Sequence, residues 1–271
     1  MRQGRGNPPL ILNEDIASQQ LASGRQDPDP PRYLQRSAGH VERAGGSGDP
    51  QGHCLSRRPG EKGGAAEQGK PFPDWRGETV AILGGGPSLC QQDIDRLDCR
   101  IIAVNDAWRL CRHADILYAC DAAWWRKKGP SQTEFRGLRV SLQHTDAIRV
   151  RRVAGIIRFS VEPGKVVTGS NSGFQAMQVA AQTGAKRIIL LGFDMTVTRG
   201  VHWHGPHGEG LRNPKENSCH TWRRAFRDAA PVIERLGIEV INCSRETELT
   251  CFPREPLEDA LCRLSQTNTA A

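Results

Sequence analysis

The sequence has no long hydrophobic run: no stretch approaches the roughly 18 consecutive apolar residues that a membrane-spanning helix requires. There is no internal repeat, and the composition of the 271 residues excludes a collagen, a coiled coil and a disulfide-dense miniprotein. At roughly 150 residues per domain, the length allows one or two globular domains. We therefore expect a globular protein without a membrane span.

Paired cysteines are also missing, although the chain has nine cysteines. The count is odd, the spacings are irregular and no C-x-x-C motif occurs, which indicates free thiols in a reducing compartment. The first residues lack the apolar segment and the cleavage site of a secretory signal. Together these observations predict a cytoplasmic protein.

Hydrophobic residues are scarce, at 37%, and the shortage is not evenly spread. Residues 1–70 contain 12 glycines and 7 prolines, whereas the remaining 201 residues contain 17 and 10. A segment without sustained apolar periodicity cannot bury enough surface to offset its ordering entropy. We predict a disordered tail over 1–70, one domain over 71–264 and a flexible end over 265–271. The alternative for the tail is that translation starts downstream of it.

The charge balance is mildly basic, with 37 basic and 30 acidic residues and a formal net charge of +7. Short basic clusters occur at residues 126–128, 149–152 and 223–227. A solvated surface is the simplest interpretation of this excess. A pocket for an anionic ligand such as a nucleotide is the second, and a nucleic-acid-binding face is allowed but not favoured.

From Pro71 onward, short apolar runs alternate with helical patterns. Strands are predicted at 79–83, 100–104, 116–120, 138–142, 156–160, 187–191 and 239–242, and helices at 93–97, 122–126, 172–183, 222–236 and 256–264. This alternation is typical of an α/β fold, here a Rossmann-like, doubly wound and mostly parallel sheet. Ligands bind such sheets beyond the carboxyl ends of the strands, so the residues that follow each strand are the candidates for a site.

A triple glycine follows the first predicted strand, in the turn Gly84-Gly85-Gly86-Pro87-Ser88. Glycine permits positive φ and lets backbone N–H groups approach an anion closely. Ser88 could donate to a phosphate or cap the next helix. The turn is neither G-x-G-x-x-G nor a P-loop, because no lysine follows. We interpret it as a nucleotide-binding turn, with an ordinary strand-to-helix turn as the alternative.

A second small-residue loop precedes the clearest helix and contains Ser170, Asn171, Ser172 and Gly173. The free N–H groups of a helix start and the positive end of its dipole favour a phosphate or a carboxylate. The alternative is a plain capped helix with Ser170 or Asn171 as the cap. Two such loops in one sheet favour the anion-binding interpretation.

Polar residues also follow three other predicted strands. Asn105 follows the second and Asp121 the third, where they could contact a base, a ribose or a metal ion. An Asx turn or a helix cap would explain them equally well. Asp194 follows the strand at 187–191 and suits Mg²⁺ or a sugar hydroxyl, with a loop cap as the alternative.

Four of the eight histidines lie within 19 residues, at positions 202, 204, 207 and 220. An imidazole near its ordinary pKa can act as a general base or acid, so His202 and His207 are candidate catalytic groups beside Asp194. H-x-H-x-x-H also offers three imidazoles to Zn²⁺, but it is not an established ligand spacing. We therefore predict acid–base chemistry or a phosphate contact in preference to a metal, with a plain surface loop as the remaining alternative.

Taken in order, the motifs GGGPSL, VNDAW, GSNSG and GAKRIILLGFDM resemble two known families over about residues 75–255. One is the 6-hydroxymethylpterin diphosphokinase MptE-like (DUF115) group, which includes uncharacterised phage and prophage proteins. The other is the small bacterial α-2,3-sialyltransferases. Resemblance to the sialyltransferases implies that Gly84, Gly86, Ser88 and Asn105 contact the nucleotide of CMP-sialic acid. It also implies that a histidine between 202 and 207 is the base.

Resemblance to the MptE-like group implies a different reaction, the transfer of pyrophosphate from ATP with Mg²⁺ to a pterin alcohol. Asp121 and Asp194 would then be candidate carboxylates for the metal. Both resemblances imply a transferase that takes a nucleoside triphosphate or a nucleotide-sugar donor and moves a (pyro)phosphoryl or glycosyl group to a small hydroxyl acceptor. The alternative from another class is a non-catalytic, phage-type binding module for nucleic acid or a host factor. The enzyme interpretation requires that the triple-glycine turn and the loop at 168–173 converge on one cavity.

Overall fold

The computed structural model describes residues 71–144, 146–153, 158–208 and 210–268. The predicted tail over residues 1–70 and the last three residues lie outside this part of the chain, so a disordered tail stays a prediction. Within the described ranges, the model contains no helix with both the length and the apolar character that crossing a membrane requires.

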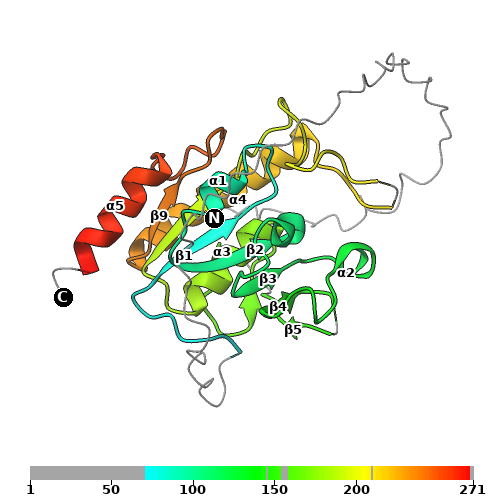
Figure 1. Ribbon diagram of the computed structural model, residues 1–271, viewed down its shortest axis with the longest axis horizontal. Helices are drawn as coiled ribbons and strands as arrows, with labels where there is room; N and C mark the ends of the chain where they lie inside the picture. Colours follow the sequence, from blue (N-terminus) through cyan, green and yellow to red (C-terminus); the bar gives the residue numbers. More distant parts are fainter. Residues whose placement is uncertain (1–70, 145, 154–157, 209, 269–271) are drawn as a thin grey trace, which may run out of the picture. The chain divides into compact units, whose positions relative to one another are not determined.

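A parallel sheet of seven strands forms the centre of the domain (Figure 1). The strands lie in the order β5-β4-β3-β2-β1-β8-β9, and every neighbouring pair is parallel. Their bounds are β1 Thr79–Leu83, β2 Arg100–Val104, β3 Ile116–Tyr118, β4 Leu138–Ser141, β5 Ile148–Arg149, β8 Arg187–Leu191 and β9 Glu239–Asn242. The predicted Rossmann-like, doubly wound α/β fold is confirmed.

Helices cover both faces of this sheet. Their bounds are α1 Gln91–Ile94, α2 Ala122–Lys128, α3 Ser172–Gln182, α4 Glu216–Arg235 and α5 Leu257–Asn268, with a 3₁₀ helix at Asn105–Arg109. The helices α3 and α4 pack on one face, while α1, α2, α5 and the 3₁₀ helix contribute to the apolar cluster on the other. Figure 1 shows α5 beside β9 at one edge of the sheet.

Alternate residues along each central strand belong to different layers of the core. In β1, Val80 and Ile82 pack with Phe174 and Phe226, whereas Ala81 and Leu83 pack in the opposite cluster. A strand buried on both faces needs apolar side chains at successive positions. This is why the central strands appear in the sequence as continuous apolar runs.

The chain reverses its direction of travel across the sheet at β1. It runs outward from β1 to β5 on one side and then returns to place β8 on the other side of β1. Connections that leave in opposite directions open a crevice beyond the carboxyl ends of the strands at such a reversal. The topology therefore favours a ligand site beside the residues that follow β1, β2 and β8.

The long apolar runs were predicted closely, whereas the short strands were not. The strands at 79–83, 100–104, 187–191 and 239–242 and the helix that begins at residue 172 have the predicted bounds within one residue. Three two-residue strands, β5, β6 (Arg151–Arg152) and β7 (Lys165–Val166), were missed. The strands β6 and β7 pair with each other in a separate small sheet.

The predicted strand at 156–160 is wrong where the structure describes it, because residues 158–160 form no strand. The backbone in this region bonds instead to glutamine side chains of α3. Ser160 and Val167 both donate their N–H groups to Oε1 of Gln178, at 3.1 and 2.8 Å, and Gly164 donates to Gln182 at 2.9 Å. Side chains of a neighbouring helix thus replace the partner strand.

Three helices are longer than their apolar patterns predicted, and the first, α2, ends at Lys128, two residues beyond its predicted end. The helix α4 begins at Glu216, whereas the predicted start was Trp222. The prediction missed the first turns because they are polar and carry little helical periodicity. The helix α5 continues to Asn268, four residues beyond its predicted end. None of the eight described cysteines forms a disulfide bond, as the sequence predicted.

Candidate functional site

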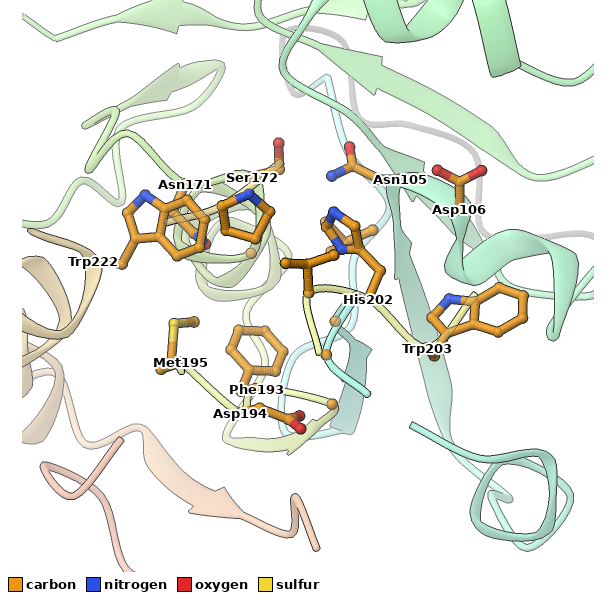
Figure 2. A pocket seen from close by; sticks show the side chains of 18 of the residues that line it. Asn105, Asp106, Asn171, Ser172, Phe193, Asp194, Met195, His202, Trp203 and Trp222 are labelled. Atoms are coloured by element: carbon orange, nitrogen blue, oxygen red, sulfur yellow. The ribbon is translucent and has the colours of Figure 1, made fainter. Parts of the chain in front are cut away.

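A pocket lies beyond the carboxyl ends of β1, β2 and β8, where the sheet topology favours a ligand site. We call it the first pocket; it is lined by the turns after these three strands, the first residues of α3, the loop at 201–207 and part of α4. The triple-glycine turn and the loop before α3 therefore do converge on one cavity. In Figure 2 the ring of His202 lies between Asn105 and Ser172 on one side and Phe193 and Asp194 on the other. The cavity volume is about 110 Å³.

The triple glycine allows a close approach between two turns of the backbone. A Cβ atom on Gly84 would lie 2.5 Å from the carbonyl oxygen of Gly192, and one on Gly86 would lie 2.7 Å from the same oxygen. The N–H groups of Gly84 and Gly86 donate to Leu191 and Gly192, at 2.7 and 2.8 Å. Only the N–H of Gly85 is left without a backbone partner in the described chain, so it alone of the three is available to an anion.

Ser88 contacts Asp194 rather than the cavity. Its N–H donates to Oδ2 of Asp194 at 2.9 Å, and its hydroxyl donates to Oδ1 at 2.7 Å. Asp194 is only 3% exposed, and burial raises its pKa while the Ser88 hydrogen bonds lower it. The pair joins the turn after β1 to the turn after β8. The predicted roles of Ser88 as a phosphate donor and of Asp194 as a catalytic group stay predictions, and in this structure the two side chains bond to each other.

Asn105 adopts a left-handed backbone conformation, with φ at +49°, at the end of β2. Asparagine tolerates this conformation better than most residues. Its side chain lines the first pocket, and Figure 2 shows the amide extending toward Ser172. Asn105 therefore lies at the first pocket, and its contact with a donor stays a prediction.

The next residue, Asp106, is buried, and its carboxylate contacts several side chains. The sequence analysis did not select it as a site residue. Its carboxylate accepts a hydrogen bond from Nε1 of Trp124 at 2.9 Å and lies 3.7 Å from Nζ of Lys128. The imidazole nitrogens of His204 and His207 lie 3.6 and 4.0 Å from its Oδ2. The acidic residue after a strand was visible in the sequence, but its partners come from distant segments.

The three histidines of the loop form one cluster. The ring centroids of His202 and His207 are 4.3 Å apart, and those of His204 lie 5.2 and 5.0 Å from them. Burial lowers the pKa of all three, that of His202 to about 4. The nearby Lys128 lowers the pKa of His207 further. The imidazoles are therefore uncharged at neutral pH.

The hydrogen bonds of the cluster assign its protons. Nε2 of His202 is buried without a hydrogen-bond partner among the described residues, whereas Nδ1 lies beside the Gly85 backbone, which raises the pKa of the ring. A backbone carbonyl that accepts from Nδ1–H leaves the lone pair of the neutral ring on Nε2. Lys128 donates to Nδ1 of His207 at 2.9 Å, so the lone pair of His207 is already engaged. His202 is thus the better placed of the two predicted bases.

A metal ion is the alternative occupant of this cluster. The three imidazoles offer nitrogen atoms within 4.8 Å of one another, which is compatible with a transition metal. The ammonium of Lys128, however, already bonds to His207 and lies close to Asp106. A divalent cation would be repelled by this fixed charge, which favours the acid–base interpretation.

The start of α3 provides the second set of donors. The side chain of Asn171 caps the helix by accepting from the N–H of Phe174 at 2.9 Å. The N–H groups of Ser172 and Gly173 lie in the first turn, where the helix offers no acceptor. A Cβ on Gly173 would lie 2.8 Å from the ring of Phe193, so glycine is needed for packing at this point. Asn171 therefore caps the helix, and the backbone N–H groups of Ser172 and Gly173 are candidate hydrogen-bond donors to an anion.

Two predicted residues lie in an adjoining cavity, which we call the second pocket. Asp121 and Ser170 line it, together with the basic segment at 149–152. Asn171 and Ser172 line both pockets, so the two cavities meet at the start of α3. The volume of the second pocket is about 940 Å³. The predicted binding residues therefore divide between two neighbouring cavities.

Two aromatic residues complete the wall of the first pocket. Figure 2 shows Trp222 and Trp203 on opposite sides of it. Trp222 donates through Nε1 to the carbonyl of Ser170 at 2.7 Å, which ties α4 to the loop before α3. Nε1 of Trp203 is buried without a hydrogen-bond partner among the described residues.

No family model matches the chain, and no curated protein matches its sequence. Among solved structures, it is similar to the sialyltransferase CstII from Campylobacter jejuni in complex with a substrate analogue, cytidine-5'-monophosphate. The TM-score is 0.44 and the identity 14%, over 67% of this chain and 86% of that chain. A likeness of this degree carries no argument about chemistry. The motif resemblance to the MptE-like group has no counterpart among these matches.

Proposed function

We propose that the domain is a transferase that binds an activated nucleotide donor and moves a glycosyl group to a hydroxyl acceptor. One observation carries the proposal: the N–H groups of Gly85, Ser172 and Gly173 belong to residues that line the same small pocket as His202, whose Nε2 is buried and has no hydrogen-bond partner among the described residues. Such a pocket brings together donors for an anionic leaving group and an acceptor for a proton. Both are required when a hydroxyl replaces a phosphate.

The sizes of the pockets suggest how the donor is divided between them. The first pocket, at about 110 Å³, is the smaller of the two and has room for a phosphate group. The second pocket, at about 940 Å³, falls within the range of roughly 300–1,000 Å³ typical of small-molecule sites. We place the phosphate in the first pocket and the rest of the donor in the second, across Ser172.

His202 is the proposed general base. Its Nε2 takes the proton of the acceptor hydroxyl while the oxygen attacks the anomeric carbon. The bond from that carbon to the donor phosphate breaks, and its electron pair leaves with the phosphate. The N–H groups of Gly85, Ser172 and Gly173 stabilise the departing charge. The nearby phosphate also raises the basicity of an imidazole whose pKa is otherwise lowered by burial.

The described carboxylates favour glycosyl transfer over pyrophosphoryl transfer. The latter takes Mg²⁺, which binds oxygen ligands. Both oxygens of Asp194 accept from Ser88, Asp106 is surrounded by Trp124 and Lys128, and Asp121 lies in the other pocket. No two of them form a free pair at the first pocket, so the described residues do not fit a magnesium site there.

A ligand screen tests the proposal. The full chain is mixed with nucleoside mono-, di- and triphosphates and nucleotide sugars, with and without Mg²⁺, and its thermal unfolding is followed. A ligand at 100 times its dissociation constant adds about 2.7 kcal/mol to the free energy of unfolding. We expect stabilisation by a nucleotide or nucleotide sugar without Mg²⁺. No binding by any member, confirmed by calorimetry, would refute the proposal.

A further inference from the structure

The second pocket carries an unusual concentration of positive charge. Arg149, Arg151 and Arg152 all line it, from the two short strands β5 and β6. None of the three forms an ion pair with any residue in the described ranges. Other arginines of the described domain do pair with carboxylates, for example Arg245 with Asp93 at 2.8 Å.

The remaining side chains of the pocket leave this charge largely uncompensated. Asp121 is the only carboxylate in its lining. Burial raises the pKa of the Cys120 thiol to about 11, so it carries no charge at neutral pH. Three arginines and one aspartate among the lining residues give a formal net charge of +2. Like charges held in one cavity repel one another, and an anion of matching charge relieves that repulsion.

The polar groups beside the arginines fit one kind of anion. Thr168, Ser170 and Ser172 line the same pocket and can supply hydroxyl donors. Guanidinium groups together with hydroxyls are suited to phosphate, because a phosphate offers three acceptor oxygens at once. A phosphate monoester carries about −1.5 to −2 charges at pH 7, which matches the net charge of the pocket, whereas a carboxylate carries only one.

We propose that the arginine cluster of the second pocket binds the phosphate of a phosphorylated acceptor. The acceptor role rests on the proposed transferase function; the phosphate site rests only on the residues of this pocket. The second pocket, at about 940 Å³, then holds this phosphate beside the part of the donor already placed there. The donor phosphate is assigned to the first pocket, so a second dianion site serves the other substrate of the reaction. Ser172 lines both cavities, and an acceptor anchored at the arginines therefore reaches the first pocket with its hydroxyl.

Calorimetry with inorganic phosphate on the full chain tests the site. We expect binding to wild type and a loss of affinity of about tenfold for Arg149→Gln and for Arg151→Gln, because each removes a charge-assisted hydrogen bond. Arg224→Gln is the matched control, since this arginine is 67% exposed on α4 and lies outside both pockets. Acetate, a monoanion, should not bind. All three arginine variants should unfold at the wild-type temperature, because the substituted side chains are exposed.

Asn105→Gly separates this site from the first pocket. Phosphate binding that survives Asn105→Gly and falls in the arginine variants supports the inference. Binding that falls in Asn105→Gly and survives in the arginine variants overturns it and leaves the donor site of the proposed function intact. If phosphate binds at the arginines but no nucleotide binds anywhere, the proposed function fails and the acceptor assignment with it. Salt-sensitive binding of a single-stranded oligonucleotide, tighter than phosphate and lost in the arginine variants, would overturn the small-molecule assignment.

Discussion

Ser88 donates two hydrogen bonds to the carboxylate of Asp194, one from its backbone and one from its hydroxyl, although 106 positions separate the two residues. The contact joins the turns after β1 and β8 on the two sides of the reversal in the sheet. It explains why a serine expected to face a phosphate lies against a buried acid. The donors that remain for an anion come from Gly85 and from the start of α3.

Replacing Ser88 by alanine should therefore lower stability more than ligand affinity. The change leaves one oxygen of a buried carboxylate without its hydroxyl donor, and we expect the free energy of unfolding to fall by about 1–3 kcal/mol. Denaturant titration measures this loss, with the exposed Thr250→Ala as the control. A large loss of nucleotide affinity at unchanged stability would show that Ser88 contacts the ligand after all.

Asn105→Gly should weaken nucleotide binding without unfolding the domain. Glycine keeps the left-handed backbone at this position, where φ is +49°, but removes the amide that lines the first pocket. We expect the dissociation constant of the nucleotide found in the screen to rise about tenfold, as for the loss of one hydrogen bond of about 1.4 kcal/mol. Unchanged affinity in calorimetry would remove Asn105 from the binding site.

His202→Asn should lower turnover far more than substrate affinity. Asparagine retains a polar side chain but cannot take a proton, so we expect kcat to fall about 10²- to 10⁴-fold with little change in KM. The initial rate of transfer from the donor identified in the screen gives both constants.

His207→Asn is the matched comparison for that variant. The lone pair of His207 is held by Lys128, so its replacement should cost less in kcat than the replacement of His202. The reverse order would move the role of the base from His202 to His207, as the sequence resemblance also allows.

The stability of the protein should fall as the pH is lowered from about 7 toward 4. An unfolded histidine titrates near 6.5, whereas burial lowers the pKa of His202 to about 4 in the folded state. Below pH 6.5 the unfolded chain binds the extra proton, so stability is lost on acidification. Asp194, whose pKa burial raises, acts in the opposite direction.

Comparison of wild type with His202→Asn isolates the contribution of this histidine. After allowance for its partial exposure to solvent, we expect on the order of 1–2 kcal/mol of the loss between pH 7 and pH 4 to disappear in the variant. Denaturant titrations at several pH values provide the measurement. Parallel curves for the two proteins would mean that His202 titrates normally in the folded state.

Local pattern was sufficient for the elements that are buried on both sides. The runs at β1, β2 and β8 are apolar and buried from their second residue onward, because each of these strands faces two layers of helices. The strands β5, β6 and β7 have two residues each. They are defined only by their hydrogen bonds to neighbouring strands, and two residues are too few to show a periodic pattern in the sequence. The segment at 158–160 looks extended, but the glutamines of α3 decide its hydrogen bonds.

The meeting of the turns after β1 and β2 with the start of α3 followed from chain order, because parallel strands present their carboxyl ends at one edge of a sheet. Which of these residues keep polar groups open to a ligand depends on contacts that form only in the folded chain. Lys128 engages His207 across 79 positions and thereby leaves the free lone pair to His202. Likewise, the hydrogen bonds of Ser88 to Asp194 hold this serine outside the lining of the first pocket. Hydrogen-bonding capacity is finite, so which groups stay open to a ligand depends on partners that only the folded chain brings within reach.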